Sequence, residues 1–322
     1  MKPQTNKFHE SIVLVGGGGG VFRIASSLKH IRPNITTIQT VFDNGGHSAR
    51  LRLDRGVLPP GDIRQAILAL SDDSGHPLLR KLLAFRFSKK NGSSLDDATV
   101  GNIMLTALTE ITGSLPVAID TMCHMFRVTG RVLPVSLDDA QLTVTLSDGT
   151  VIEGEGQIDT RSVADSRTIV SASLKPRAHI YCRAYEAIAS ADKIIFCPGD
   201  FWTSLVPNLL VESFRDALKE TKAKSIFVTN IMTKKSETDR YTTATFAQKL
   251  CEYTGLNSIH AMVSNDGTIP SEILARYESE QARPVIFAKT SLVKQFIRGD
   301  LVDLVDGVIR HHNKVASIIA EL

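Results

Sequence analysis

The stretch from residue 41 to residue 65, VFDNGGHSARLRLDRGVLPPGDIRQ, combines acids, arginines and glycines in a pattern that suits a polyphosphate ligand. Asp43 and Asp62 are two carboxylates that can hold a divalent cation, and magnesium is the candidate cofactor. Guanidinium groups offer forked donors to phosphate oxygens, and the stretch has four of them: Arg50, Arg52, Arg55 and Arg64. Glycine lets backbone approach a ligand closely, and the glycines here are Gly45, Gly46 and Gly61. A surface loop whose charges only pair with one another is the alternative interpretation.

A run of glycines lies near the start of the chain, between the apolar segment 11–15 and a segment with helical spacing at 21–31. The run consists of Gly16, Gly17, Gly18, Gly19 and Gly20. Strand, glycine turn and helix open a doubly wound unit, and backbone N–H groups at such a helix N-terminus favour an anion. A tight turn without a ligand is the alternative. The dinucleotide fingerprint is incomplete because Val21 stands at its third glycine, and the absence of G-K-[ST] excludes a P-loop.

The order of the remaining segments predicts an α/β fold, a Rossmann-like three-layer parallel sheet within a single nucleotide-binding domain spanning residues 1–322. Short apolar runs predict further strands at 35–42, 193–197, 225–229, 260–263 and 285–288. Helical spacing appears at 61–86, 103–111, 115–125, 181–190 and 307–322. Between them, residues 131–175 read as short alternating strands separated by Asp and Gly turns, which predicts a small antiparallel β insertion. This insertion either covers a sheet edge or forms a homodimer contact.

Polar residues after the later strands extend the candidate site, because ligands bind at the carboxyl ends of strands in open α/β sheets. The loop 198–204 follows one predicted strand and supplies Gly199, Asp200, Thr203 and Ser204. Asn230 follows the next strand. Asn102 lies at the start of a predicted helix, where a simple cap is the equal alternative.

Composition excludes several classes of protein. The formal charge of +3 gives no reason to expect nucleic acid as a partner. Four cysteines without a C-x-x-C pair indicate neither a zinc site nor a disulfide framework. The sequence contains neither a signal-peptide core nor an apolar run of membrane-spanning length, so we expect a cytoplasmic protein without membrane insertion.

The position of Asp43 keeps a nicotinamide dinucleotide-binding oxidoreductase open as an alternative. This residue lies 23 positions after Gly20 and just past the second strand, where a ribose-binding acid stands in nicotinamide-binding folds. A metal ligand is equally consistent with that spacing. The sequence offers neither a recognisable hydride-acceptor site nor a nucleophile with an adjacent histidine of evident role, so no catalytic residue is assigned.

An ordered set of motifs resembles the gluconeogenesis factors, which share a superfamily with the 2-phospho-L-lactate transferase of deazaflavin coenzyme synthesis. The motifs run from Ile12 to His311 and comprise the glycine-rich first loop, DNGG-x-S-x-RLR, LPPGDIR, LSD, GN, ALTEITG, PGD-x-x-TS-x-x-PNLL, NIM and ETD-x-YT. The resemblance implies a Rossmann-like sheet. Its gluconeogenesis-factor branch binds nucleotide diphosphate sugars and is associated with carbon metabolism and cell shape. Its transferase branch moves a phospholactyl-type group from a nucleotide diphosphate donor, with magnesium.

Residue by residue, the chain follows the family pattern with a few departures. Gly19 replaces a usual threonine in the first loop, and Asn44 stands at the second position of a common Asp-Asp pair. An amide brings no negative charge, so this change weakens the expected magnesium site. Asp200 stands where serine is usual, and we hypothesise that it restores the charge. The family pattern is retained at Ser48, Arg50 and Arg52.

The GGHSARLR and NIM-to-ETD segments resemble the gluconeogenesis-factor branch. The prediction is therefore a regulatory protein that binds a nucleotide diphosphate sugar, with uridine diphosphate sugars as the leading candidates. A transferase that moves a phosphoryl-linked group from a nucleotide diphosphate donor to an acceptor hydroxyl is the alternative.

Overall fold

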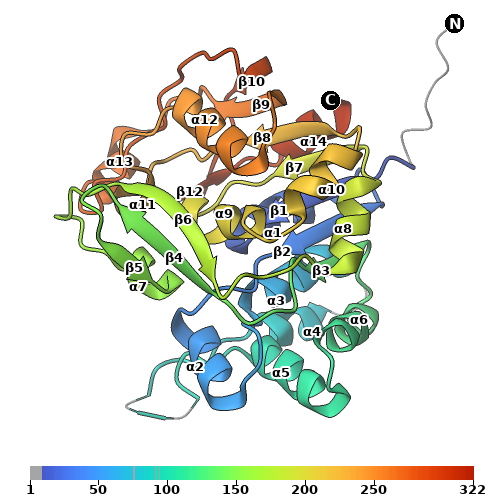
Figure 1. The fold of residues 1–322 in the computed structure, drawn as a ribbon. Helices are drawn as coiled ribbons and strands as arrows, with labels where there is room; N and C mark the ends of the chain where they lie inside the picture. The colour runs from blue at the N-terminus through green and yellow to red at the C-terminus, as the bar shows by residue number, and fades with distance from the viewer. Residues whose placement is uncertain (1–8, 75–76, 91, 94) are drawn as a thin grey trace, which may run out of the picture.

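A computed structural model describes residues 9–74, 77–90, 92–93 and 95–322, and its centre is a seven-stranded parallel sheet (Figure 1). The strand order is β10-β9-β8-β7-β1-β2-β3, and every neighbouring pair is parallel. The strands are β1 (Ile12–Gly16), β2 (Ile35–Gln39), β3 (Arg131–Pro134), β7 (Lys193–Phe196), β8 (Lys224–Val228), β9 (Ile259–Asn265) and β10 (Val293–Gly299). This sheet with flanking helices confirms the predicted α/β fold.

The central strands of the sheet are buried on both faces. All five residues of β1 and of β2 are buried, as expected for parallel strands covered by helices. The chain winds outward from β1 in both directions, and right-handed crossovers then place the connecting helices on opposite faces. One group packs around α1 (Gly18–Leu28), and the other contains α8 (Cys182–Ala189), α9 (Val206–Leu209), α10 (Phe214–Glu220) and α12 (Thr243–Thr254).

The antiparallel insertion is smaller than the range 131–175. Its three strands are β4 (Gln141–Leu146), β5 (Val151–Glu153) and β6 (Ile169–Lys175), in the order β5-β4-β6. The segment 131–134 pairs in parallel with β2 and belongs to the main sheet, so its assignment to the insertion was wrong. A short helix, α7 (Glu155–Asp159), lies within the range 131–175, where only strands and turns were expected.

Two predictions near the end of the chain were also wrong. Residues 285–288 form only isolated bridges, and the edge strand is β10 further along. Residues 307–322 are not one helix: they contain β12 (Val308–His311) and then α14 (Lys314–Glu321). β12 pairs with β11 (Val302–Val305) in a hairpin, and the residues of β12 alternate between exposed and partly buried, which is a strand period.

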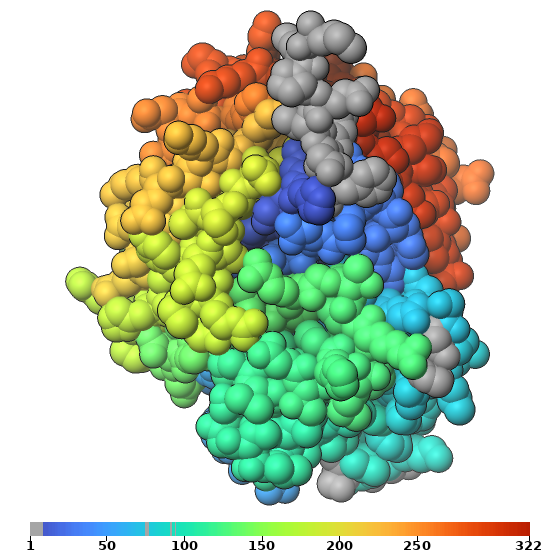
Figure 2. Space-filling view, turned by 90° about the vertical axis from the view of Figure 1, so that its right-hand side faces the viewer, coloured from blue at the N-terminus to red at the C-terminus, as the bar shows by residue number. Residues whose placement is uncertain are grey.

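The stretch 41–65 is mostly helical rather than a loop. It forms α2 (Gly46–Arg55), which Gly56 ends in the left-handed conformation, and the start of α3 (Gly61–Leu70). With α4 (Pro77–Ala84), α5 (Val100–Thr112) and α6 (Leu115–Met125) these helices form a layer beside the β3 edge. Figure 2 shows part of this layer, α4 to α6 in cyan to green, across the lower part of the turned molecule. None of the helices among the described residues is long and apolar enough to cross a membrane.

Candidate nucleotide and cation site

The carboxyl ends of β1, β2, β7 and β8 meet at one edge of the sheet, and most of the predicted site residues follow them. The glycine run leads from β1 into α1. The segment after β7 is Pro198-Gly199-Asp200, followed by a π-helical turn, η1 (Phe201–Leu205). Asn230 follows β8, and its Nδ2 donates to the carbonyl of Gly199 at 2.6 Å. The sheet therefore brings three segments that are distant in sequence to the N-terminus of α1.

Two of the glycines are required by close contacts. A Cβ at Gly20 would lie 1.6 Å from the carbonyl oxygen of Pro198, and a Cβ at Gly17 would lie 2.2 Å from Oδ2 of Asp62. The first contact is with backbone, so a Cβ at Gly20 would require the chain to move, whereas a Cβ at Gly17 would require the Asp62 side chain to shift. The run thus allows the Pro198 loop on one side and the Asp62 carboxylate on the other to pack directly against the start of α1.

A pocket of about 230 Å³ opens beside this helix start. Four predicted residues line it: Gly19, Gly20, Gly199 and Asn230. The sequence did not single out its other walls, which come from α1, from the segment after β8, from α13 (Ser271–Tyr277) and from β12. These walls include the cations Arg23 and Arg310 and the apolar side chains Ile231, Met232, Tyr277 and Ile309.

The β11–β12 hairpin is fixed over the pocket by specific polar contacts. Arg23 Nε donates to the carbonyl of His311 at 2.7 Å, and the same guanidinium pairs with Asp303. His311 Nε2 lies 2.9 Å from the carbonyl of Thr229. Desolvation lowers the pKa of His311 to about 4, so the ring is neutral at pH 7 and its Nε2–H donates to that carbonyl. Arg310 is exposed and is left to line the pocket.

Carboxylates gather on the other side of the α1 N-terminus. Asp62 accepts from the backbone N–H of Gly18, while burial and the neighbouring charge of Asp43 raise the pKa of Asp62 to about 7. Glu155, from α7 of the insertion, shares a hydrogen bond with Asp43; burial and then Asp43 raise the pKa of Glu155 to about 9. The predicted pair Asp43 and Asp62 is therefore adjacent, and Glu155 is a third oxygen ligand candidate. Carboxylate oxygens are the ligands that a magnesium ion prefers, but the three carboxylates of the described residues whose oxygens lie within 4.8 Å of one another are Asp159, Asp200 and Glu237.

The Asn44 side chain uses both its acceptor and its donor, which a carboxylate at this position could not do. Its Oδ1 accepts from the backbone N–H of Gly156 at 2.6 Å, and its Nδ2 donates to Oε1 of Gln141 at 2.9 Å. Both ends of the amide therefore bind the insertion. Arg52 acts in the same way, since its guanidinium contacts Asp139 and the carbonyl of Ala140. These two predicted ligand residues fasten the insertion to the core.

A second acidic group surrounds Lys234, just before α11 (Lys235–Thr238). The Lys234 ammonium pairs with Asp159 of the insertion, with Asp200 Oδ2 at 3.0 Å and with Glu237 Oε1 at 3.0 Å. Burial alone would lower the pKa of Lys234, but the charges of Glu237, Asp200 and Asp159 outweigh it and raise that pKa. Asp200 is thus paired with a lysine, while the hypothesis that it replaces the charge missing at Asn44 stays a prediction.

Glu237 is the buried member of this group and also orders the η1 turn. Its Oε2 accepts from the backbone N–H of Trp202 at 2.8 Å, and its Oε1 accepts from the Thr203 hydroxyl at 3.1 Å. Burial, followed by the charge of Asp200, raises the pKa of Glu237 to about 6. The predicted residue Thr203 is therefore engaged with Glu237 rather than directed at the pocket. Ser204 donates its backbone N–H to the carbonyl of Asp200 at 2.7 Å.

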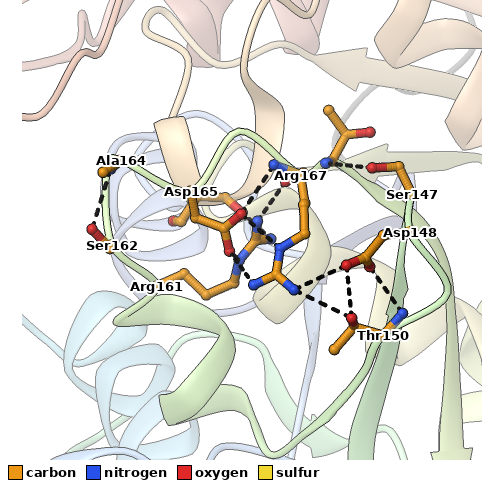
Figure 3. Close-up of polar contacts among 10 residues, drawn as sticks. Ser147, Asp148, Thr150, Arg161, Ser162, Ala164, Asp165 and Arg167 are labelled. Atoms are coloured by element: carbon orange, nitrogen blue, oxygen red, sulfur yellow. Dashed lines mark hydrogen bonds and ion pairs between the residues drawn. The ribbon is translucent and has the colours of Figure 1, made fainter.

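The insertion has its own polar network, which is centred on Asp165 and Arg167 (Figure 3). Asp165 accepts from Arg161 Nε at 3.2 Å and from Arg167 Nε at 2.9 Å, and Arg167 also reaches Asp148 at 3.2 Å. Hydrogen bonds from Arg167 hold the pKa of Asp165 well below its usual range. Arg161 Nη1 donates to the carbonyl of Ser236 at 3.0 Å. The network links the insertion to α11, so the insertion is held at both Asn44 and the Lys234 cluster.

Comparison with known proteins places this geometry in a family. The family model for 2-phospho-L-lactate transferase CofD matches residues 12–302. The chain belongs to this family. It is 36% identical over 316 residues to the gluconeogenesis factor of Bacillus subtilis (strain 168), a match that covers 97% of each chain. It is 34% identical over 318 residues to the gluconeogenesis factor of Halalkalibacterium halodurans, covering 97% of this chain and 96% of the relative.

Solved structures agree with the sequence comparison. A crystal structure of a UPF0052 family member from Bacillus halodurans superposes with a TM-score of 0.89 at 33% identity. It covers 96% of this chain and 99% of its own. The resemblance to gluconeogenesis factors and to the CofD superfamily, predicted from the motifs, is confirmed.

Within this family fold, the other predicted residues divide between the two sides of the α1 N-terminus and the helical layer. Ser48, Gly45 and Gly61 lie beside Asp43: a Cβ at Gly61 would be 2.8 Å from Ser48 Oγ and 3.6 Å from Asp43 Oδ2. Gly46 begins α2, and Gly16 packs against Val21 and Cys197. Asn102 is buried, and its Oδ1 accepts from Arg64 Nε at 2.9 Å. Arg50 points to the carbonyl of Asp96, away from the glycine run.

Replacing Asp62 by asparagine is expected to change how stability depends on pH. A carboxyl whose folded pKa is raised binds its proton more tightly when folded, so the free energy of unfolding falls as pH rises from about 4 to about 7. The amide does not titrate, so the substitution removes that penalty. Because Asp62 keeps part of its surface in solvent, we expect the stabilisation by D62N to be about 2 kcal/mol larger at pH 8 than at pH 5. Urea denaturation at the two pH values measures this difference, and equal stabilisation at both would contradict it.

Proposed function

We propose that this chain binds a nucleotide diphosphate sugar at the N-terminus of α1 and acts as a regulatory protein of the gluconeogenesis-factor kind. The observation that carries the proposal is the 230 Å³ pocket. Its walls are the glycine-rich start of α1, two arginines and several apolar side chains. Backbone N–H groups at a helix start favour phosphate, and the guanidinium groups of Arg23 and Arg310 suit the same anion. Ile231, Met232, Tyr277 and Ile309 offer apolar surface to a base or sugar ring.

Magnesium is part of the proposal. Asp43 and Asp62 would hold the ion, with Glu155 as a third oxygen donor, and the ion would neutralise phosphate charge. Burial, followed by the charge of Asp43, raises the pKa of both Asp62 and Glu155, and a bound cation would favour their ionised forms. Both ends of the Asn44 amide are hydrogen-bonded to the insertion, so we propose that the carboxylates, and not Asn44, bind the ion.

A transferase that moves a phosphoryl-linked group from a nucleotide diphosphate to an acceptor hydroxyl is the second candidate. The observation that favours it is the proximity of Asp43, Asp62 and Glu155 to the start of α1. A carboxylate near a bound diphosphate can accept the proton of an acceptor hydroxyl as that oxygen bonds to the distal phosphorus and the P–O–P bond breaks, while arginine and a cation stabilise charge on the leaving nucleoside monophosphate. Turnover with a deazaflavin acceptor would establish this activity.

The relatives are named gluconeogenesis factors, which supports a role in central carbon metabolism. We propose that the protein works in the cytoplasm, in the control of central carbon metabolism and cell shape. We also propose that it can form a homodimer. Sedimentation of the full chain with and without nucleotide tests the last point.

A ligand panel tests the proposal directly. We expect uridine diphosphate sugars to raise the melting temperature more than guanosine nucleotides, deazaflavin or nicotinamide dinucleotides, because a ligand at a hundred times its Kd adds about 2.7 kcal/mol. Arg310→Gln should weaken the binding of a uridine diphosphate sugar about tenfold by calorimetry, through loss of a charge-assisted contact. Arg177→Gln, which changes an exposed arginine paired with Glu212, should leave the Kd unchanged. Equal affinity of both variants for the nucleotide sugar would show that Arg310 does not contact the ligand.

A further inference from the structure

A second cavity, of about 460 Å³, lies between α2 and α5 in the helical layer. The side chains from α2 are spaced by three and four residues and so share one face of that helix: His47, Arg50, Leu51, Asp54 and Arg55. The side chains from α5 have the same spacing: Ile103, Thr106, Ala107 and Glu110. The cavity shares no lining residue with the pocket beside α1. It is a groove between two helices that face one another without filling the space between them.

The groove combines an apolar wall with charged side chains of both signs, namely Arg50 and Arg55 on one hand and Asp54 and Glu110 on the other. Leu51, Ile103 and Ala107 supply apolar surface from both helices. Arg50 is exposed and contacts the carbonyl of Asp96, and within the described residues it takes part in no ion pair. It lies one helical turn from His47, so both face the same part of the groove. This part of the groove can accept an anion, with the apolar wall beside it.

The groove has polar atoms that the protein itself does not satisfy. His47 is only 8% exposed, and its Nδ1 has no hydrogen-bond partner among the residues that the structure describes. The buried Oγ1 of Thr106, on the opposite helix, is in the same situation. Burial, then the charges of Arg50 and Arg86, lower the pKa of His47, which keeps the ring neutral and able to accept a hydrogen bond. Buried polar atoms without partners destabilise a protein, and because both atoms have almost no exposed surface, a ligand would reach them only after a side-chain shift that widens the groove.

We propose that the groove between α2 and α5 binds a small organic anion with an apolar ring, with its charged group at Arg50 and its ring against Leu51, Ile103 and Ala107. The volume falls within the range of small-molecule sites. A simple packing defect would be lined by apolar side chains that a larger residue could fill, whereas this groove contains a guanidinium without an ion pair and a buried neutral imidazole. The proposal does not depend on nucleotide binding, because the two pockets are lined by different residues.

The test uses the full chain and 1-anilinonaphthalene-8-sulfonate, which joins an aromatic ring system to one anionic group. We expect saturable fluorescence at one site per chain. Ala107→Trp should fill the groove and weaken binding at least about tenfold, and Arg50→Gln should weaken it about tenfold through loss of a charge-assisted contact. An aromatic carboxylate such as anthranilate should displace the dye, whereas inorganic phosphate should not. A uridine diphosphate sugar should leave the dye bound.

Control variants separate the groove from other apolar surface. α4 exposes Leu82 and the following Phe85, by 43% and 50%, and a dye that bound there would respond to Leu82→Gln and Phe85→Ser. If these variants weaken dye binding while Ala107→Trp and Arg50→Gln do not, the proposal is wrong. Displacement by phosphate alone would also overturn it, because the site would then recognise only charge. Should Ala107→Trp fail to fold, Arg50→Gln, which alters an exposed side chain, decides the question.

Discussion

Lys234→Met is expected to destabilise the protein by about 3 kcal/mol at pH 8, because it leaves a buried carboxylate without its cation. Oxygen atoms of Asp159, Asp200 and Glu237 lie within 4.8 Å of one another, and the Glu237 side chain has no exposed surface. Lys234 is the cation that holds them together. The loss should shrink as pH falls toward 5, since carboxyls that gain protons no longer repel one another. Urea denaturation at both pH values measures the effect.

Two further variants define the cause of that loss. Lys219→Met removes an exposed ammonium 2.9 Å from Asp216 and should cost no more than about 0.5 kcal/mol. Lys234→Met combined with Glu237→Gln removes the stranded buried charge and should recover much of the stability. If Lys234→Met were no more destabilising than Lys219→Met, the cluster would be an ordinary surface ion pair and would not hold the insertion in place.

The parts of the fold that could be predicted from sequence are those with a strong local signal. The apolar run before the glycines predicts a strand buried on both faces, and the glycines that follow it predict the start of a helix; both are present as β1 and α1. Helix α2 was missed because Gly45 and Gly46 stand at its start and arginine recurs along it, and such composition also suits a loop. The surroundings of α2 depend on α5, which packs opposite it in the folded chain. His47 and Arg50 line the groove between these two helices.

The missed site residues lacked a local signal altogether. Arg310 and Ile309 lie in a hairpin far along the chain from the glycine run, and only tertiary structure brings them to α1. The role of Asn44 depends on the position of Gln141 in the insertion, nearly a hundred residues away. Lys234 stands among polar residues that any loop contains, and its importance comes from three carboxylates contributed by separate elements. Spacing along the chain does not encode such long-range partners.

Gly20→Ala is expected to destabilise the protein by about 3 kcal/mol and to weaken nucleotide binding at least about tenfold. The added Cβ would meet the carbonyl oxygen of Pro198 at 1.6 Å, and a backbone atom cannot rotate away as a side chain can. Either α1 or the loop 198–200 must therefore move. Both form walls of the pocket, so a change in their separation alters the position of the N–H groups that would meet a diphosphate.

Gly19→Ala is the matched control, because a Cβ at Gly19 meets no atom within 4 Å. Alanine restricts the unfolded chain more than glycine does, so this variant should be as stable as the parent or about 0.5 kcal/mol more stable. Urea denaturation compares the two variants, one residue apart in the same helix turn. Equal midpoints would mean that the Pro198 loop is not packed on α1, and the pocket would then lack one of its walls. Both positions are helical and only position 20 is crowded. A large difference would therefore mean that glycine is needed at position 20 because of the close contact and not because of backbone flexibility.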